Sequence, residues 1–452
     1  MPNAARMPNP TRKTALVVGL GLTGLSCVRY LVAQGYDVRV ADTRTAPPQL
    51  NAVKQAYPEL PIRTGAFDPT WFRQAQLVCI SPGVSVAEPA VQAAIAAGAE
   101  IVGDIELFAR AAKAPVLAIT GSNGKSTVTS LVGKMCEAAK LDTRVGGNIG
   151  VAALSLLAPK EPDVYVLELS SFQLETTSSL NARASCVLNI TPDHMDRYPS
   201  LAAYAAAKAR IYAGDGAMVL NADDPIVMRM RRPGRDTVCF GLSPLQRCDD
   251  YILREHAGES WLMCGAEPIL PAREVPLPGR HNLANVLAAL ALTDAMRVPR
   301  AAQIAAIRAF RGLPHRTELV AERDGVRWIN DSKGTNVGAT VAALSGMTAP
   351  VVLIAGGDGK GADFGDLKPA CARHARAVVL IGRDAPLIET ALAGAVPSVH
   401  ASDMRDAVIK ARALARSGDL VLLSPACASF DMFRNYEHRG DVFRAAVEEV
   451  LR

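Results

Sequence analysis

The stretch AITGSNGKST, residues 118–127, follows a short apolar run and precedes a segment with the apolar spacing of a helix. It contains a shortened phosphate-binding motif, G-x-x-G-K-[S/T], because Ile119 stands where the full consensus has its first glycine. In such a loop the backbone N–H groups bind phosphate, Lys125 neutralises phosphate charge and the hydroxyl of Ser126 can bind Mg²⁺. The stretch therefore predicts an α/β domain in which a phosphate-binding loop joins a strand to a helix.

The composition limits the class of protein. A chain of 452 residues is too long for one compact core, so we expect about two to four domains. Half of the residues are apolar but only 5% are aromatic, which favours helices packed on parallel sheets. The net charge of +5 is small and gives no indication of a nucleic-acid partner.

Targeting signals and cysteine motifs are missing from the sequence. No apolar run reaches the roughly 18 residues of a membrane span, and the first dozen residues lack the apolar core of a signal peptide. The nine cysteines are scattered singly without a C-x-x-C pair, which predicts reduced thiols rather than a disulfide or zinc framework. We therefore expect a cytoplasmic protein, with Met1 or Met7 as its first residue.

The order of apolar runs divides the chain into three α/β blocks. Residues 1–103 and 313–452 each show four short buried-type strands with helical segments between them. Residues 104–312 contain the phosphate-binding loop and a polar, β-rich excursion over about 231–278, followed by a helix from His281. The predicted fold is a three-domain α/β architecture: a Rossmann-like N-terminal domain, a central P-loop ATPase-type domain with a parallel sheet, and a Rossmann-like C-terminal domain.

Three residues beyond the loop are candidates for its chemistry. Glu168 ends the next predicted strand of the central block, where α/β sheets gather their ligands, so we expect it to be a magnesium ligand. His194 in TPDHMD is compatible with a metal ligand, a helix cap or a surface residue. Lys208 lies in the helical stretch LAAYAAAKARIY, where a single lysine normally faces solvent.

A second glycine-rich turn, GLGLTG at residues 19–24, follows the first predicted strand. With Asp42 some eighteen residues beyond it, this turn matches the fingerprint of an NAD-binding oxidoreductase, in which Asp42 would hold the adenosine ribose. That hypothesis leaves residues 118–127 unexplained. The turn itself indicates only that the backbone can approach a diphosphate closely.

Together these stretches resemble the Mur ligase family, the ATP-dependent amide-forming enzymes of peptidoglycan assembly. The resemblance covers nearly the whole chain and is also carried by GDIELF, GGNIG, LELSSFQLETTSSL, TPDHMDRY, AAKARIY, GRHNLANVLAALAL, GLPHR, WINDSKGTNVGAT, GGDGKGADF and SPACASFDMFRNYEHRG. Within the family it points to the ligation of D-glutamate to UDP-N-acetylmuramoyl-L-alanine. ATP would activate the substrate carboxylate as an acyl phosphate, which the amine of D-glutamate then attacks, releasing ADP and phosphate. Another amino-acid ligase of the same superfamily and a non-enzymatic nucleotide switch are the alternatives.

The resemblance also implies the site residues. Those expected at ATP are Gly121, Ser122, Asn123, Gly124, Lys125, Ser126, Thr127, Asn282, Asn285, Arg316 and Asp331. Those expected at the UDP-linked substrate are Leu22, Thr23, Asp42, Thr43, Arg44, Gly83, Asn148, Ser170 and Gln173. Those expected at D-glutamate are Lys333, Thr335, Lys360, Ser429, Phe430 and Tyr436.

The implied catalytic group is Lys125, Glu168, His194 and Lys208, with two Mg²⁺ ions. One ion would be held by Ser126, Glu168 and the phosphates, and the other by His194 and Lys208. An ammonium group cannot bind a cation, so the resemblance implies that Lys208 is carbamylated, which makes its tip an anionic oxygen donor. Because ATP contacts would come from two blocks, we expect domain closure in a protein that acts as a monomer.

Overall fold

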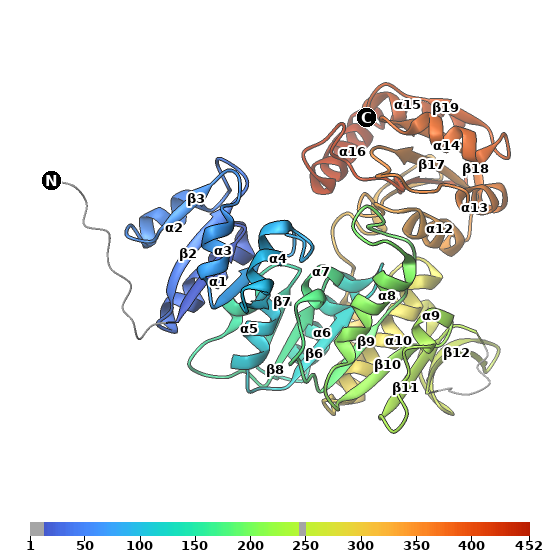
Figure 1. The fold of residues 1–452 in the computed structure, drawn as a ribbon. Coiled ribbons are helices and arrows are strands. Elements are labelled where there is room, and N and C mark those ends of the chain that lie inside the picture. The colour runs from blue at the N-terminus through green and yellow to red at the C-terminus, as the bar shows by residue number, and fades with distance from the viewer. Residues whose placement is uncertain (1–12, 244–249) are drawn as a thin grey trace.

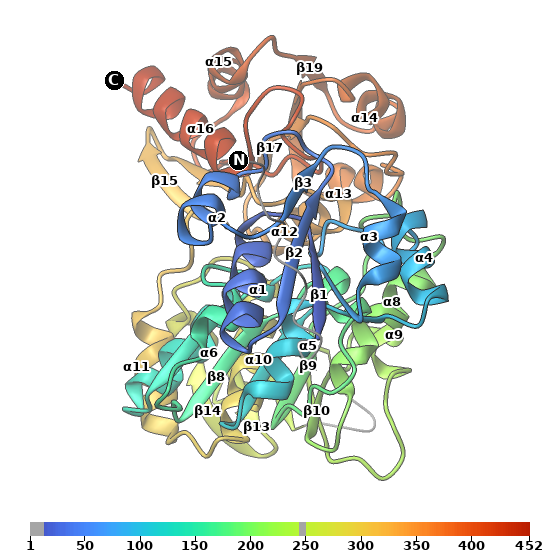
Figure 2. The same cartoon turned by 60° about the vertical axis from the view of Figure 1, so that its left-hand side comes forward.

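The computed structural model describes residues 13–243 and 250–452. The chain forms three α/β bodies in series, each built on its own sheet, and the middle body lies between the other two in sequence and in space (Figures 1 and 2). This confirms the predicted three-domain α/β fold. The predicted junction at 103/104 falls between β5 and α5, and that at 312/313 falls between α11 and β15. Met1, Met7 and Cys248 lie outside the described residues.

The first body has a parallel five-stranded sheet in the order β3-β2-β1-β4-β5. Its strands are β1 (Thr14–Val18), β2 (Asp37–Asp42), β3 (Ile62–Thr64), β4 (Leu77–Ile80) and β5 (Glu100–Val102). Its helices are α1 (Leu22–Ala33), α2 (Leu50–Ala56), α3 (Pro69–Gln74) and α4 (Pro89–Ala96). Four of the strands were expected from their apolar runs. The fifth, β3, is a partly exposed edge strand whose three residues carry no apolar pattern.

The middle body has a nine-stranded sheet in the order β14-β13-β12-β11-β10-β9-β6-β8-β7. Seven strands are parallel: β6 (Val116–Thr120), β7 (Thr143–Gly147), β8 (Val164–Glu168), β9 (Ala184–Val187), β10 (Ala217–Asn221), β11 (Thr237–Gly241) and β12 (Tyr251–His256). The antiparallel strands β13 (Glu259–Cys264) and β14 (Glu267–Pro271) complete the predicted β-rich excursion at the sheet edge.

Helices cover both faces of this sheet. They are α5 (Asp104–Ala111), α6 (Lys125–Ala138), α7 (Ser171–Glu175), α8 (Leu201–Ala209), α9 (Pro225–Met228), α10 (Arg280–Asp294) and α11 (Arg300–Ala309). Short 3₁₀ turns are η1 (Ala153–Leu156), η2 (Arg210–Tyr212) and η3 (Ala272–Glu274). One apolar cluster gathers α6, α10 and α11, whereas a second joins α5, α8 and η1 to the inner side of the first body.

The third body has a six-stranded sheet in the order β15-β16-β20-β17-β18-β19, in which only the β15–β16 pair is antiparallel. Its strands are β15 (Glu318–Arg323), β16 (Val326–Asn330), β17 (Val351–Gly356), β18 (Ala375–Ile381), β19 (Ser398–His400) and β20 (Leu420–Leu423). Its helices are α12 (Val337–Gly346), α13 (Leu367–His374), α14 (Ala385–Leu392), α15 (Met404–Leu414) and α16 (Tyr436–Val450). The two strands absent from the prediction, β15 and β19, are partly exposed edges without a buried apolar run.

None of the helices in the described part of the chain combines the length and apolarity needed to span a lipid bilayer. Within the same residues, none of the eight cysteines forms a disulfide.

Candidate active site

The phosphate-binding loop connects β6 to α6, as its sequence predicts. Gly121 and Gly124 have φ angles of +153° and +84°, so the turn uses backbone conformations that disfavour a side chain. A Cβ on Gly124 would also lie 2.5 Å from Oδ1 of Asn285. Conformation therefore favours glycine at both positions, and close approach adds to this at Gly124.

Two residues that the sequence analysis missed brace this loop from the chain after β9. The amide of Asn189 accepts a hydrogen bond from the backbone N–H of Asn123 (2.8 Å) and donates to its carbonyl (3.1 Å). The hydroxyl of Ser122 donates to the carbonyl of Thr191 and accepts from its N–H, both at 2.9 Å. Because β9 pairs with β6, residues just after β9 lie beside the loop that follows β6. The polar residues of NIT, 189–191, at this strand end were the signal that could have indicated these contacts.

The side chain of Lys125 extends back over the phosphate-binding loop. Its Nζ donates to the carbonyls of Gly121 and Ser122 at 2.9 Å each. Burial lowers the pKa of this ammonium group, while the nearby charge of Glu168 opposes that shift. A cation is thus held directly at the phosphate-binding turn.

Glu168 ends β8, beside Ile119 of β6, and is only 2% exposed. Its Oε1 accepts a hydrogen bond from Nδ2 of Asn148 at 2.7 Å, whereas its Oε2 is buried without a partner. A buried carboxylate oxygen normally has a hydrogen-bond or metal partner, and hard oxygen donors are what Mg²⁺ prefers. The unpartnered, buried oxygen of Glu168 is thus a free hard donor at the strand end beside the strand that leads into the phosphate-binding loop.

Lys208 does not face solvent, so the interpretation of it as an exposed helix residue is wrong. It is 1% exposed, and its Nζ donates to the carbonyl of Gly121 at 2.8 Å and to Oγ1 of Thr120 at 3.4 Å. Burial, reinforced by the charge of Lys125, lowers its pKa well below the usual value. A lowered pKa increases the fraction of neutral amine, which is the form that reacts with CO₂.

His194 lies in a turn with a φ of +57° and packs against Phe172, with ring centroids 4.8 Å apart. Burial is the main cause of a lowered pKa, which favours the neutral imidazole that can bind a metal. The helix-cap alternative is wrong, because Ser200 caps the following helix α8. Among the described residues, no cluster of three His, Cys, Asp or Glu side chains can hold a metal ion. Two predicted ions would therefore also need the hydroxyl of Ser126, phosphate oxygens and Lys208 in the carbamate form that the resemblance implies.

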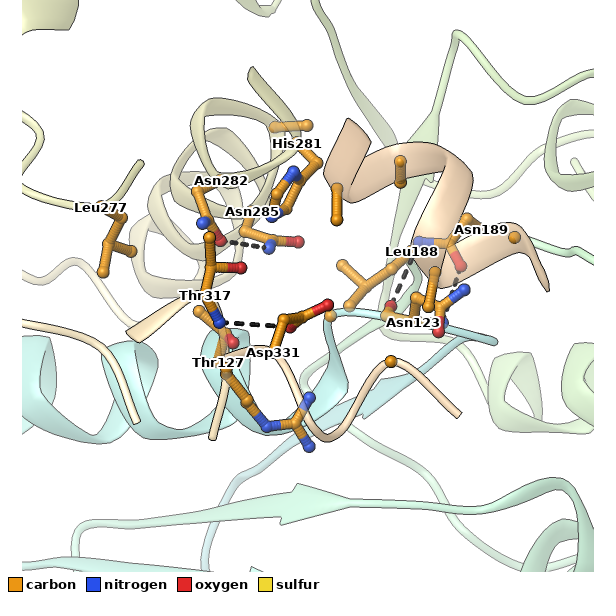
Figure 3. A pocket seen from close by; sticks show the side chains of 18 of the residues that line it. Asn123, Thr127, Leu188, Asn189, Leu277, His281, Asn282, Asn285, Thr317 and Asp331 are labelled. Atoms are coloured by element: carbon orange, nitrogen blue, oxygen red, sulfur yellow. Dashed lines mark hydrogen bonds between the residues drawn. The ribbon is translucent and has the colours of Figure 1, made fainter. Parts of the chain in front are cut away.

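A cavity of about 320 Å³ lies beside the loop, between the N-terminus of α10 and the third body (Figure 3). This volume is at the lower end for small-molecule sites. Seven of the predicted ATP residues line it: Asn123, Gly124, Thr127, Asn282, Asn285, Arg316 and Asp331. The remaining four, Gly121, Ser122, Lys125 and Ser126, belong to the adjoining phosphate-binding loop.

The wall at α10 combines paired amides with one unpaired ring nitrogen. Nδ2 of Asn285 donates to Oδ1 of Asn282 at 3.0 Å (Figure 3). Nδ2 of Asn282 donates to the carbonyl of Pro278 at 2.7 Å. The neighbouring His281, which sequence reasoning missed as a wall residue, has a buried Nδ1 without a partner and a pKa lowered to about 4 by burial. Apolar side chains of Leu188 and Leu277 complete this part of the cavity.

The third body contributes charged groups to the same cavity. Nη2 of Arg316 donates to Oγ of Ser126 at 2.7 Å, across the junction between the bodies. Asp331 accepts hydrogen bonds from the N–H of Thr317 and the hydroxyl of Ser424, and burial raises its pKa to about 6. Lys333 lies with Nζ 3.8 Å from the ring centroid of Tyr436, and burial lowers its pKa to about 8.

The residues predicted at D-glutamate lie on loops after neighbouring strands of the third sheet. Thr335 follows β16, Lys360 follows β17 and Ser429 follows β20, while Tyr436 begins α16. Paired backbone hydrogen bonds between Asp358 and Ala428, at 2.8 and 3.0 Å, join the loop of Lys360 to the loop of Ser429. Ser429 is buried and Lys360 is exposed, and the charge of Lys360 contributes to the lowered pKa of His194. Phe430 is 70% exposed.

The residues predicted at the UDP-linked substrate fall into two groups. Leu22, Thr23, Thr43, Arg44 and Gly83 lie on the first body, where all but Thr23 are exposed. Asp42 is 2% exposed and lies beneath the glycine turn: its Oδ2 accepts from the N–H of Leu20 at 2.6 Å and its Oδ1 accepts from the N–H and Nε of Arg44. The carboxylate of Asp42 thus organises the turn.

The second group belongs to the middle body. Asn148 donates to Glu168, as described above, and Ser170 and Gln173 form the capping box of α7. Nε2 of Gln173 also donates to the buried carboxylate of Asp104 at 3.2 Å. Burial raises the pKa of Asp104 to about 6. The side chains of Asn148, Ser170 and Gln173 therefore already form hydrogen bonds within the middle body.

The sequence of the chain matches known families and proteins along most of its length. Three family descriptions match the chain in order: "Mur ligase MurD-like, N-terminal domain" over residues 13–103, "Mur ligase middle domain" over 119–293 and "Mur ligase, glutamate ligase domain" over 315–427. The UDP-N-acetylmuramoylalanine–D-glutamate ligase of Nitrosococcus oceani is 55% identical over 440 residues, covering 97% of both chains. The enzyme of the same name from Methylobacillus flagellatus is 54% identical over 441 residues, again covering 97% of both.

Solved structures share the fold at lower identity. The UDP-N-acetylmuramate-alanine ligase MurC from Thermotoga maritima has a TM-score of 0.60 at 18% identity, covering 97% of this chain and 99% of that one. FolC from E. coli in complex with ADP has a TM-score of 0.56 at 19% identity, covering 76% of this chain and 93% of that one. From the ordered family matches and the full-length relatives at more than half identity, we conclude that the chain belongs to the Mur ligase family.

Proposed function

We propose that this chain ligates D-glutamate to UDP-N-acetylmuramoyl-L-alanine at the expense of ATP, in peptidoglycan precursor synthesis. The observation that carries this proposal is the full-length similarity to ligases of that name, at 54–55% identity. The site has the parts that such a reaction needs, because a phosphate-binding loop, an adjoining cavity and cations from two bodies meet in one place.

The first step joins two anions, since the substrate carboxylate attacks the γ-phosphate of ATP and ADP leaves. Lys125 at the loop and Arg316 and Lys333 from the third body supply positive charge where the negative charges meet. The acyl phosphate formed is then attacked by the amine of D-glutamate, and phosphate leaves as the amide forms. We assign the two carboxylates of D-glutamate to Thr335, Lys360, Ser429 and the chain around Phe430 and Tyr436, which supply cationic, hydroxyl and N–H donors.

Family membership and the donor set indicate that the reaction uses ATP with Mg²⁺. The unpartnered Oε2 of Glu168, next to the loop that carries Ser126, supports one ion there. We propose a second ion at His194 and Lys208, with Lys208 as a carbamate. The deep burial of this amine beside the phosphate loop and its lowered pKa support the proposal. Bound Mg²⁺ would neutralise phosphate charge, while the side chains named here position the phosphates.

The glycine turn at residues 19–24 is assigned to the UDP portion of the substrate. The carboxylate of Asp42 accepts hydrogen bonds from Leu20 and Arg44, which argues against a free ribose-binding acid of the NAD type. We further propose a monomeric enzyme that works in the cytoplasm, where ATP and UDP-linked sugars are supplied. Closure of the third body over ATP predicts a smaller radius of gyration with an ATP analogue and substrate, and equal radii in solution scattering would count against closure.

The deciding experiment measures phosphate release with ATP, Mg²⁺, UDP-N-acetylmuramoyl-L-alanine and one amino acid at a time. We expect release with D-glutamate and little with L-glutamate, L-lysine or meso-diaminopimelate. Activity with L-lysine or meso-diaminopimelate but not D-glutamate would identify a different amino-acid ligase of the same family. Phosphate release that is independent of both acceptor substrates would instead favour a nucleotide switch.

A further inference from the structure

Asn336 is the residue before α12 in the third body, yet most of its side-chain contacts are in the middle body. It is 8% exposed. Its Oδ1 accepts from the N–H of Ala339 at 2.8 Å, which caps α12, and from Nδ2 of Asn123 at 3.4 Å. Its Nδ2 donates to Oδ1 of Asn123 at 3.3 Å and to Oδ2 of Asp193 at 3.2 Å. Every hydrogen-bonding position of this amide is therefore used, three of them across the junction.

Capping alone does not explain an asparagine here. Ser, Asp and Asn are nearly equivalent as helix caps, because each supplies one accepting oxygen. Only an amide can accept from a backbone N–H and also offer two donors to partners on another body. The cross-junction contacts are thus the part of the arrangement that depends on this residue type.

Both partners belong to segments that carry the predicted chemistry. Asn123 is at the tip of the phosphate-binding loop, and Asp193 accepts from the N–H of His194 through its other oxygen at 3.0 Å. On its own side, Asn336 ends the loop that carries Lys333 and Thr335. The amide therefore joins the third-body loop to the phosphate-binding loop and to the turn of His194.

The backbone around Asn336 fits closely against the middle body. A Cβ on Gly338, in the first turn of α12, would lie 2.7 Å from Oγ1 of Thr191. Thr191 precedes Asp193 by two residues and also holds Ser122 of the phosphate-binding loop. The start of α12 is thus seated on the segment that it contacts through Asn336.

We propose that Asn336 is a positioning residue for the ligation: it aligns the phosphate-binding loop and the His194 turn with the third body, so that nucleotide binding is coupled to the loop at residues 331–336. The proposal rests on the proposed function for its kinetic consequences. Asn336 acts on the nucleotide indirectly, through its contacts with Asn123 and Asp193. Breaking these contacts should therefore weaken nucleotide binding without unfolding α12.

The test begins with Asn336→Asp, which keeps the cap, removes both donors and places a second carboxylate opposite Asp193. We expect kcat/KM for ATP to fall about 10- to 100-fold, as for the loss of one or two hydrogen bonds that involve a charged group. Asn336→Ser keeps the cap without adding charge, and we expect a loss of about tenfold. The affinity for a non-hydrolysable ATP analogue, measured by calorimetry, should fall in parallel, whereas the thermal unfolding midpoint should stay within about 2 °C of wild type.

The exchange Asn336→Asp with Asp193→Asn separates positioning from simple damage. It restores a donor and an acceptor between residues 336 and 193 in the opposite sense, and an asparagine at 193 can still accept from the N–H of His194. We expect the double variant to recover at least about fivefold in kcat/KM over Asn336→Asp, incompletely because the bond that Asn336 donates to Oδ1 of Asn123 stays broken. Additive losses in the double variant, or a single variant with wild-type analogue affinity, would overturn the proposal. If wild type releases no phosphate with D-glutamate, the proposed function fails, while analogue affinity still tests Asn336.

Discussion

Replacing Lys208 with methionine tests whether this buried amine serves catalysis or folding. Methionine has a similar length and an apolar stem, and it loses the cation–π contact in which Nζ lies 4.7 Å from the ring centroid of Tyr204. The substitution removes only the amine and everything that can be built on it. We expect activity to be lost while the protein stays folded.

The structure sets the size of the stability effect. The variant loses the bond to the carbonyl of Gly121 (2.8 Å) and the longer one to Thr120 (3.4 Å). Neither partner is left alone, because Lys125 still donates to Gly121 and Thr120 donates to the carbonyl of Leu169. The lost bonds are worth about 1.5–3 kcal/mol, and removal of a buried ammonium group gains a similar or larger amount. The free energy of unfolding should therefore be unchanged or higher by up to about 2 kcal/mol.

The effect on turnover should be much larger. Without the amine there is no carbamate oxygen to hold the second proposed ion, and the loss of one such electrostatic group typically lowers kcat by at least about 100-fold. Phosphate release and thermal unfolding, measured on the same preparation, separate the two effects. Added bicarbonate should not restore activity. Lys134→Met is the matched control: Lys134 is exposed on α6 and paired with Glu137, so both readouts should match wild type.

Two results would refute this reasoning about Lys208. Near-wild-type turnover in Lys208→Met would show that neither the amine nor its carbamate takes part in the reaction. A drop of several degrees in the unfolding midpoint would show that the ammonium group stabilises the phosphate-binding turn, so that lost activity could be structural.

Three further substitutions give distinct readouts. Asp104→Asn should raise the free energy of unfolding relative to wild type by about 3 kcal/mol at pH 7.5. Burial raises the pKa of Asp104 from 3.8 to about 6 in the folded state, so the stability that the protonated acid contributes is lost as the pH rises through about 6. This difference should shrink toward zero near pH 4 in denaturant titrations, and a difference that is constant with pH would contradict the buried-acid argument. Gly124→Ala should abolish measurable ATP-analogue binding, since φ is +84° and the new Cβ meets Asn285; calorimetry with normal affinity would show that the loop relaxes. Arg316→Lys should raise the KM for ATP about tenfold through loss of the bond to Ser126. The exposed Arg311→Lys is the control, and an unchanged KM in Arg316→Lys would exclude a role of Arg316 in ATP binding.

The fold was largely predictable because buried parallel strands appear as short apolar runs. The phosphate-binding loop and its position between β6 and α6 followed from sequence, and Glu168 was singled out because it ends the strand predicted next after this loop and its helix. The edge strands β3, β7, β15 and β19 escaped prediction because their residues are partly exposed and do not form apolar runs.

The orientation of Lys208 could not be predicted for a different reason. The helix LAAYAAAKA has alanines on every face, so no apolar stripe indicates which side is buried. Tertiary packing against the phosphate-binding loop decides it. Asn189 and Asn336 escaped because their partners lie 66 and up to 213 residues away, and such pairs leave no local pattern.

The division of the apolar clusters has a consequence for how the chain folds during synthesis. One cluster joins β1 and α1 of the first body to α5, β8 and β10 of the middle body, and includes residues as far as Cys239. The two clusters of the third body contain only residues between 326 and 451. The N-terminal body can pack one face of its sheet with residues between 16 and 94, but the other face cannot complete its core until about half of the chain has left the ribosome. The C-terminal body, in contrast, can fold as an independent unit once it is made.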